Sequence, residues 1–87
     1  MSRNEKLLSR LLSVPNDFAW EELVRILSYF GYSILKNGKT GGSRRKFADE
    51  NKKLITLHKP HPSNLVKTYV ILDVIAHLKT NKHIKDE

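Results

Sequence analysis

Two groups of side chains in the middle of the chain have the chemistry to act on a phosphodiester. The first is the run Arg44-Arg45-Lys46, and the second contains His58 and His61. A guanidinium offers a planar fork that matches two phosphate oxygens. Histidine titrates near neutral pH, so it can accept or release a proton. Cations that hold a phosphate beside a proton carrier favour binding, or metal-independent cleavage, of a nucleic acid backbone.

Two strands of a hairpin must position these groups. Residues 43–48 and 53–58 have strand character, and Asp49-Glu50-Asn51 between them is a turn signal. Side chains alternate between the faces of a strand. We expect the apolar side chains to face the core, namely Phe47, Ile55 and Leu57. The open face would then carry Arg44, Lys46, Thr56 and His58. Arg45 falls on the core side in this register and would have to reach the sheet edge.

The charge of the chain is concentrated around this hairpin. The 87 residues carry a formal net charge of +7. Residues 36–67 hold nine Lys or Arg against two acids, so they account for the whole net charge. Such a confined basic field favours a polyanionic partner, usually nucleic acid. Lys39 and Lys59 extend the field on both sides of the two strands, and we assign both to phosphate binding.

The remaining composition bounds the class of protein. A chain of this length supports one modest core. It has no cysteine, which excludes disulfides and thiolate zinc sites and fits a reducing compartment. We find no signal peptide and no apolar run of membrane-spanning length. We therefore expect a cytoplasmic protein with no membrane partner.

The periodicity of the sequence predicts three helices and three strands. Helices are expected over 3–14, 18–30 and 67–79, and strands over 32–36, 43–48 and 53–58. Asn16 or Asp17 is the expected N-cap of the second helix, and Gly31 its stop. Short connections make the sheet antiparallel. The prediction is an α+β fold of the double-stranded-RNA-binding type, α-β-β-β-α, with an extra N-terminal helix and a three-stranded antiparallel sheet packed on helices. We divide the chain into an N-terminal helical extension (1–16), the domain (17–84) and a tail (85–87).

From about Trp20 to Ile84 the chain resembles the HicA (YcfA-like) toxins, small ribonucleases of prokaryotic toxin–antitoxin modules. The similarity lies in the order of four features. They are a helix ending in Phe30-Gly31-Tyr32, Gly42-Ser43 opening a strand with Phe47 near its end, the Ile55-Thr56-Leu57…His61 segment, and a final helix with an aliphatic stripe. The resemblance implies a double-stranded-RNA-binding-like fold, cleavage of mRNA that inhibits translation, no cofactor, and neutralisation by a HicB-type antitoxin, with oligomers formed through that antitoxin.

One position departs from the family pattern. The usual motif is Gly-Ser-His with a catalytic histidine, whereas this chain has Gly42-Ser43-Arg44. We interpret the chain as a variant branch in which His58 or His61 supplies the catalysis, and we assign no metal site. Two alternatives remain open at this point. They are an RNA-binding module of the same fold that has lost catalysis, and a protein-interaction module whose basic face docks an acidic partner.

Four other side chains have less specific expectations. Tyr32 and Tyr69 have rings that could stack on bases, but core packing is the expected role of each. His77 and His83 lie on or after the final helix, and we expect them to be exposed to solvent.

Overall fold

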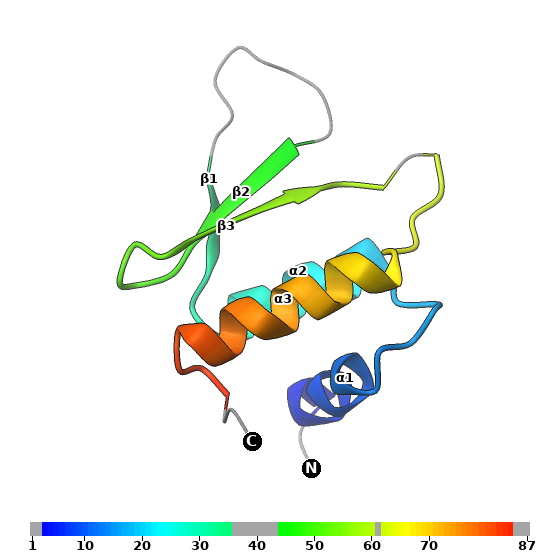
Figure 1. Cartoon of the computed structure of the whole chain (residues 1–87), viewed down its shortest axis with the longest axis horizontal. Coiled ribbons are helices and arrows are strands. Elements are labelled where there is room, and N and C mark those ends of the chain that lie inside the picture. The colour runs from blue at the N-terminus through cyan, green and yellow to red at the C-terminus, as the bar shows by residue number, and fades with distance from the viewer. Residues whose placement is uncertain (1–2, 36–43, 61, 85–87) are drawn as a thin grey trace.

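The computed structural model describes residues 3–35, 44–60 and 62–84. Its elements follow in the order α1 (Arg3–Leu12), α2 (Trp20–Tyr29), β1 (Ser33–Leu35), β2 (Arg44–Ala48), β3 (Leu54–His58) and α3 (Thr68–Thr80). The strands form one antiparallel sheet in the order β1-β2-β3. Figure 1 shows α2 and α3 lying between the sheet and α1. The predicted α+β class and the order of elements are confirmed.

The helices bury one face of the sheet. The ring of Trp20, the first residue of α2, lies 6.1 Å from that of Phe47 in β2, measured between centroids. From α3, the aliphatic stripe predicted by the sequence is buried against the same core; its most enclosed members are Ile71, Val74, Ile75 and Leu78. A sheet this small is stable only when one face is covered in this way. The opposite face of β2 and β3 is exposed to solvent.

The start of α2 differs from the prediction. Neither Asn16 nor Asp17 is the N-cap; that position belongs to Ala19, and the Glu22 carboxylate accepts a hydrogen bond of 2.9 Å from the Ala19 N–H. The cause is a long-range pairing. The Val66 N–H donates to the carbonyl of Phe18 over 2.7 Å, beside an isolated β-bridge between Ala19 and Leu65 that holds Ala19 extended. This long-range hydrogen bond outweighs the local preference for Asn16 or Asp17 at the N-cap, because tertiary contacts commonly override local propensities.

The end of α2 follows the prediction at Gly31. This residue has φ +91°, a region that residues with a Cβ rarely adopt. The Gly31 N–H donates to the Ser28 carbonyl over 3.0 Å, and the Tyr32 N–H donates to the Leu27 carbonyl over 2.9 Å. These two bonds satisfy carbonyls at the helix end in a Schellman motif. The turn directs the chain from α2 into β1.

α1 packs on the rest of the structure through two leucines and one arginine. Leu7 and Leu11 are buried in the common core. The Arg10 guanidinium binds the Glu22 carboxylate at 2.9 Å and the Asp17 carboxylate at 2.8 Å. Leu8 is partly buried against the same core, whereas Leu12 is 44% exposed. The division of the chain at residues 16 and 84 stays a prediction.

A buried carboxylate ties the β2–β3 turn to the C-terminal segment. Asp49 Oδ1 accepts hydrogen bonds from the N–H groups of Asn51 (2.9 Å) and Lys53 (2.8 Å), which fixes the turn. Its Oδ2 lies 3.0 Å from His83 Nε2. The His83 ring also packs edge-on to Tyr32. The expectation that His83 is exposed is wrong, because its ring packs against Phe30 and Tyr32 and lies against the Asp49 carboxylate.

Asp49 should make stability depend on pH in the acid range. Burial disfavours its charged form, but the backbone N–H of Lys53 and the His83 ring outweigh this and hold the pKa of the carboxyl below the usual 3.8. A lowered pKa in the folded state contributes stability that is complete above about pH 5 and is lost as the pH falls through the folded pKa, below 3.8. We expect the urea midpoint to fall more steeply below pH 4 in wild type than in Asp49→Asn, with Glu50→Gln behaving as wild type. Parallel pH curves for all three proteins would contradict this role.

Candidate nucleic-acid interface

Arg44 and His58 lie directly opposite each other on the open face of the sheet. The register pairs Arg44 with His58 and Lys46 with Thr56. Directly opposed residues on antiparallel strands share a face, with Cβ atoms about 5 Å apart. All four residues are exposed. The predicted parity is confirmed, and it places two cations and a histidine on one surface, which we call the basic face (Arg44, Lys46, Thr56 and His58).

The other face of the same strands is apolar. Phe47 is paired with Ile55, and both are buried. Arg45 is paired with the buried Leu57, so it lies on the side of the helices, as the parity predicted. Its Nη1 donates a 3.0 Å hydrogen bond to the carbonyl of Arg44. Arg45 therefore belongs to a different side of the sheet from Arg44, and its assignment to phosphate binding stays a prediction.

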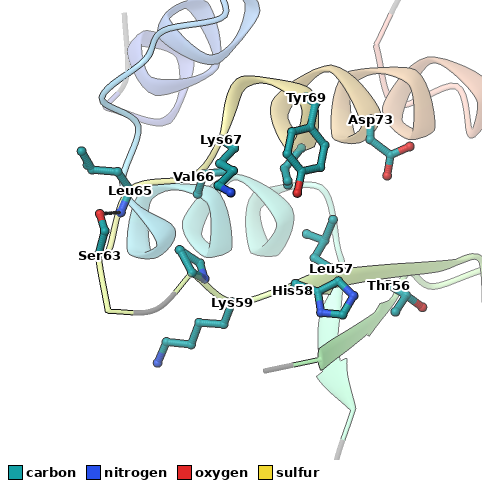
Figure 2. Close-up of a pocket in the computed structure, with 12 residues that line it drawn as sticks. Thr56, Leu57, His58, Lys59, Ser63, Leu65, Val66, Lys67, Tyr69 and Asp73 are labelled. Carbon is teal, nitrogen blue, oxygen red and sulfur yellow. Dashed lines mark hydrogen bonds between the residues drawn. The ribbon is translucent and has the colours of Figure 1, made fainter. Parts of the chain in front are cut away.

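A cleft opens where β3 ends. It lies between this edge strand and the start of α3 and has a volume of about 560 Å³. Figure 2 shows side chains from both elements around it. The polar side chains of its wall include Thr56, His58, Lys59, Lys67, Tyr69 and Asp73. Because His58 and Thr56 belong to both surfaces, the cleft continues the basic face around the edge of the sheet.

Tyr69 is exposed and lines this cleft, contrary to the expectation that it packs in the core. Tyr69 is 67% exposed, and Figure 2 shows its hydroxyl directed from α3 towards the end of β3. The helical period explains the error. Residues two apart on a helix lie about 200° apart around its axis, so the burial of Ile71 turns Tyr69 outward. Tyr32, by contrast, is buried as expected, and its hydroxyl accepts a hydrogen bond from Asn81.

The loop that forms one end of the cleft is anchored to α2. The Trp20 N–H donates to the Asn64 carbonyl over 2.9 Å, and the Asn64 amide donates to the Glu21 carboxylate. That hydrogen bond holds the pKa of the Glu21 carboxyl below its usual value. Val66, two residues further on, is buried. These contacts fix residues 64–66 against the start of α2 and so place Lys67 and the start of α3 relative to that helix.

Two of the predicted site residues lie outside the described residues. These are Lys39, assigned to phosphate binding, and His61, assigned to catalysis. Lys59 is described; it is exposed and lines the cleft next to His58. The structure therefore brings together His58, Lys59, Arg44 and Lys46 at the end of the β2–β3 ladder.

Sequence reasoning missed the contribution of α3 to this site. Lys67, Tyr69 and Asp73 line the cleft opposite His58. The signal available in the sequence was the spacing of Tyr69 and Asp73, since residues four apart share one face of a helix. Nothing local shows which strand that face approaches.

Two further properties of the described residues bear on the class of site. No group of three or more His, Asp or Glu side chains among them is arranged to hold a metal ion. Within the same ranges, no helix has the length and apolar character needed to cross a membrane.

Comparison with known proteins identifies one family. Residues 20–80 match the family model described as the HicA toxin of bacterial toxin–antitoxin systems. Comparisons with curated proteins and with solved structures gave no match. The matched range contains α2, the whole sheet and α3, and so includes both the basic face and the cleft.

Proposed function

The chain belongs to the HicA toxin family of bacterial toxin–antitoxin systems, and we propose that it is the module's endoribonuclease, which cleaves mRNA and thereby inhibits translation. The observation that carries the proposal is the pairing of Arg44 with His58 on the exposed face of the sheet. A phosphate bound by the guanidinium would lie within reach of the imidazole. The cleft beside His58 offers room for the adjoining nucleotide.

The proposed reaction needs no metal. His58 takes the proton from the ribose 2′-hydroxyl, whose oxygen attacks the phosphorus and forms a cyclic phosphate. The 5′ oxygen of the next nucleotide leaves and receives a proton, for which we propose His61. The guanidinium of Arg44 holds two phosphate oxygens and stabilises the charge of the phosphorane-like transition state. Lys46 and Lys59 bind the flanking phosphates.

The proposed partners follow from the family and from the charge. Family membership implies an antitoxin in the same module, and we propose a HicB-type protein that covers the basic face and mediates any oligomer. A toxin directed at mRNA acts in the cytoplasm. A short neighbouring reading frame for such an antitoxin would support this pairing.

A second function has one specific observation in its favour. Arg44 stands where the family pattern has its catalytic histidine, so the chain would be a non-catalytic RNA-binding module if no other histidine takes over. Both functions use the basic face to bind RNA. They differ only in whether the bound RNA is cleaved.

The direct test measures RNA binding and cleavage with the purified chain in the presence of EDTA. We expect cleavage products from labelled mRNA without added metal. Binding should weaken steeply with salt, because contacts from Arg44, Lys46, Lys59 and Lys67 release counterions. Four such contacts on a single strand predict a roughly fiftyfold loss of affinity between about 50 and 200 mM salt. Salt-sensitive binding without products would favour the second function. Absence of RNA binding at low salt would exclude both.

A further inference from the structure

Two side chains of α3 reach over the cleft from the side opposite to His58. Tyr69 and Asp73 are four residues apart and so share one face of the helix. Figure 2 shows both side chains directed towards β3, and both line the cleft. The ring of Tyr69 is largely exposed, which leaves a flat aromatic surface beside the site proposed for the scissile phosphate.

Asp73 is the one acid among the described residues that line this cleft. Two cations, Lys59 and Lys67, line it as well. A carboxylate repels RNA phosphate, so it would weaken a site that held only the backbone. It is suited to accept hydrogen bonds from the donors on a base edge. Its Oδ2 lies 3.7 Å from His77 Nε2, one turn along the helix, and 57% of the side chain is exposed.

We propose that the cleft reads one base of single-stranded RNA, and that the base is guanine. The base stacks on Tyr69, its phosphate lies near Lys59 and Lys67, and its Watson–Crick edge donates to Asp73. This proposal rests on the RNA-binding function proposed above and adds a substrate preference to it. Unpaired bases are commonly recognised by such a combination of stacking and edge contacts.

Guanine is the base whose edge fits a carboxylate. Its N1–H and N2 amino group are neighbouring donors, so they match the two carboxylate oxygens. Adenine and cytosine place a ring nitrogen acceptor beside their amino group. The lone pair of that nitrogen would repel the second carboxylate oxygen, so only one hydrogen bond could form. Uracil has a single N–H between two carbonyl oxygens. Inosine lacks the N2 amino group of guanine, so it isolates the contribution of the second hydrogen bond.

The experiment measures binding of labelled pentanucleotides to the full chain by fluorescence anisotropy at low salt. The probes are UUGUU, UUIUU and UUUUU, where I is inosine, with 2′-fluoro sugars that lack the attacking hydroxyl. We expect wild type to bind the guanine probe roughly tenfold or more tightly than the uracil probe, with inosine between them. Equal affinity for the three probes would overturn the proposal.

Two variants assign the recognition to residues. Asp73→Asn should abolish the difference between guanine and inosine, whereas Glu50→Gln, which removes an acid outside the cleft, should keep it. Tyr69→Ala should weaken all three probes by roughly five- to a hundredfold, because stacking does not depend on base identity. Tyr29→Ala, which removes a matched exposed tyrosine on α2, should bind as wild type. Retained discrimination in Asp73→Asn, or unchanged binding in Tyr69→Ala, would contradict the assignment.

Failure of this inference can be told apart from failure of the proposed function. The same proteins are assayed for cleavage of unmodified RNA. A preference for the guanine probe without cleavage of unmodified RNA would support the base subsite and overturn the proposed endoribonuclease activity. Cleavage without base discrimination would overturn the subsite alone.

Discussion

Replacing His58 with alanine is expected to slow RNA cleavage by roughly a hundred- to ten-thousandfold, the usual loss when a general base is removed. The reason is its position opposite Arg44 at the end of the β2–β3 ladder, where the guanidinium would hold the phosphate beside the imidazole. The measurement is single-turnover cleavage of labelled RNA at saturating protein. Cells that express His58→Ala should also grow, whereas cells that express the wild-type chain should not.

Several controls separate catalysis from folding and binding. His58 is exposed, so His58→Ala should keep the thermal midpoint and most of the affinity for RNA. Lys53→Ala changes an exposed residue at the other end of the same hairpin and should cleave at close to the wild-type rate. His61→Ala is assayed under identical conditions. Its cleavage rate should also fall, because we propose that His61 protonates the leaving oxygen. Full cleavage and full toxicity in both histidine variants would show that the chemistry lies elsewhere.

Removal of the Arg44 side chain should have the second-largest effect. Arg44→Ala is expected to lower the cleavage rate at saturation by roughly a hundred- to a thousandfold, as when a preorganised donor to a transition-state oxygen is lost. Arg44→Lys keeps the charge but loses the two-pronged geometry, so its rate should lie between those of Arg44→Ala and wild type. The decisive quantity is the rate at saturation, because an effect on KM alone would mean that Arg44 only binds substrate.

Two comparisons sharpen this prediction. Lys46→Ala removes a cation from the same face, opposite Thr56 instead of His58, and should weaken binding with little change in the saturated rate. Arg44→His places a second histidine opposite His58, as the family resemblance would expect at this position, and it should cleave faster than Arg44→Ala. If Arg44→Ala cleaves at the wild-type rate, the arginine has no part in the reaction.

The alternation of the hairpin sequence was sufficient to predict the basic face. Period-two alternation is a local property of the chain, and the register that it requires is fixed by a short turn. The Asp49 carboxylate binds the N–H groups of Asn51 and Lys53 and so holds that turn. A slip by one residue would have buried Arg44 and exposed Phe47, at a large cost in apolar burial. The positions of Arg44, Lys46 and His58 were therefore predictable.

Contacts between distant segments decided what the sequence left open. The start of α2 depends on the hydrogen bond from the Val66 N–H to the Phe18 carbonyl, and the partly buried position of His83 depends on Asp49, 34 residues earlier. No local pattern encodes such pairings, because they form only when the chain closes on itself. The sequence alone thus determined the class of fold, the charge and the faces of the hairpin. Only the tertiary structure placed Tyr69 and Asp73 of α3 beside His58, because that placement depends on how a helix packs against the edge of a sheet.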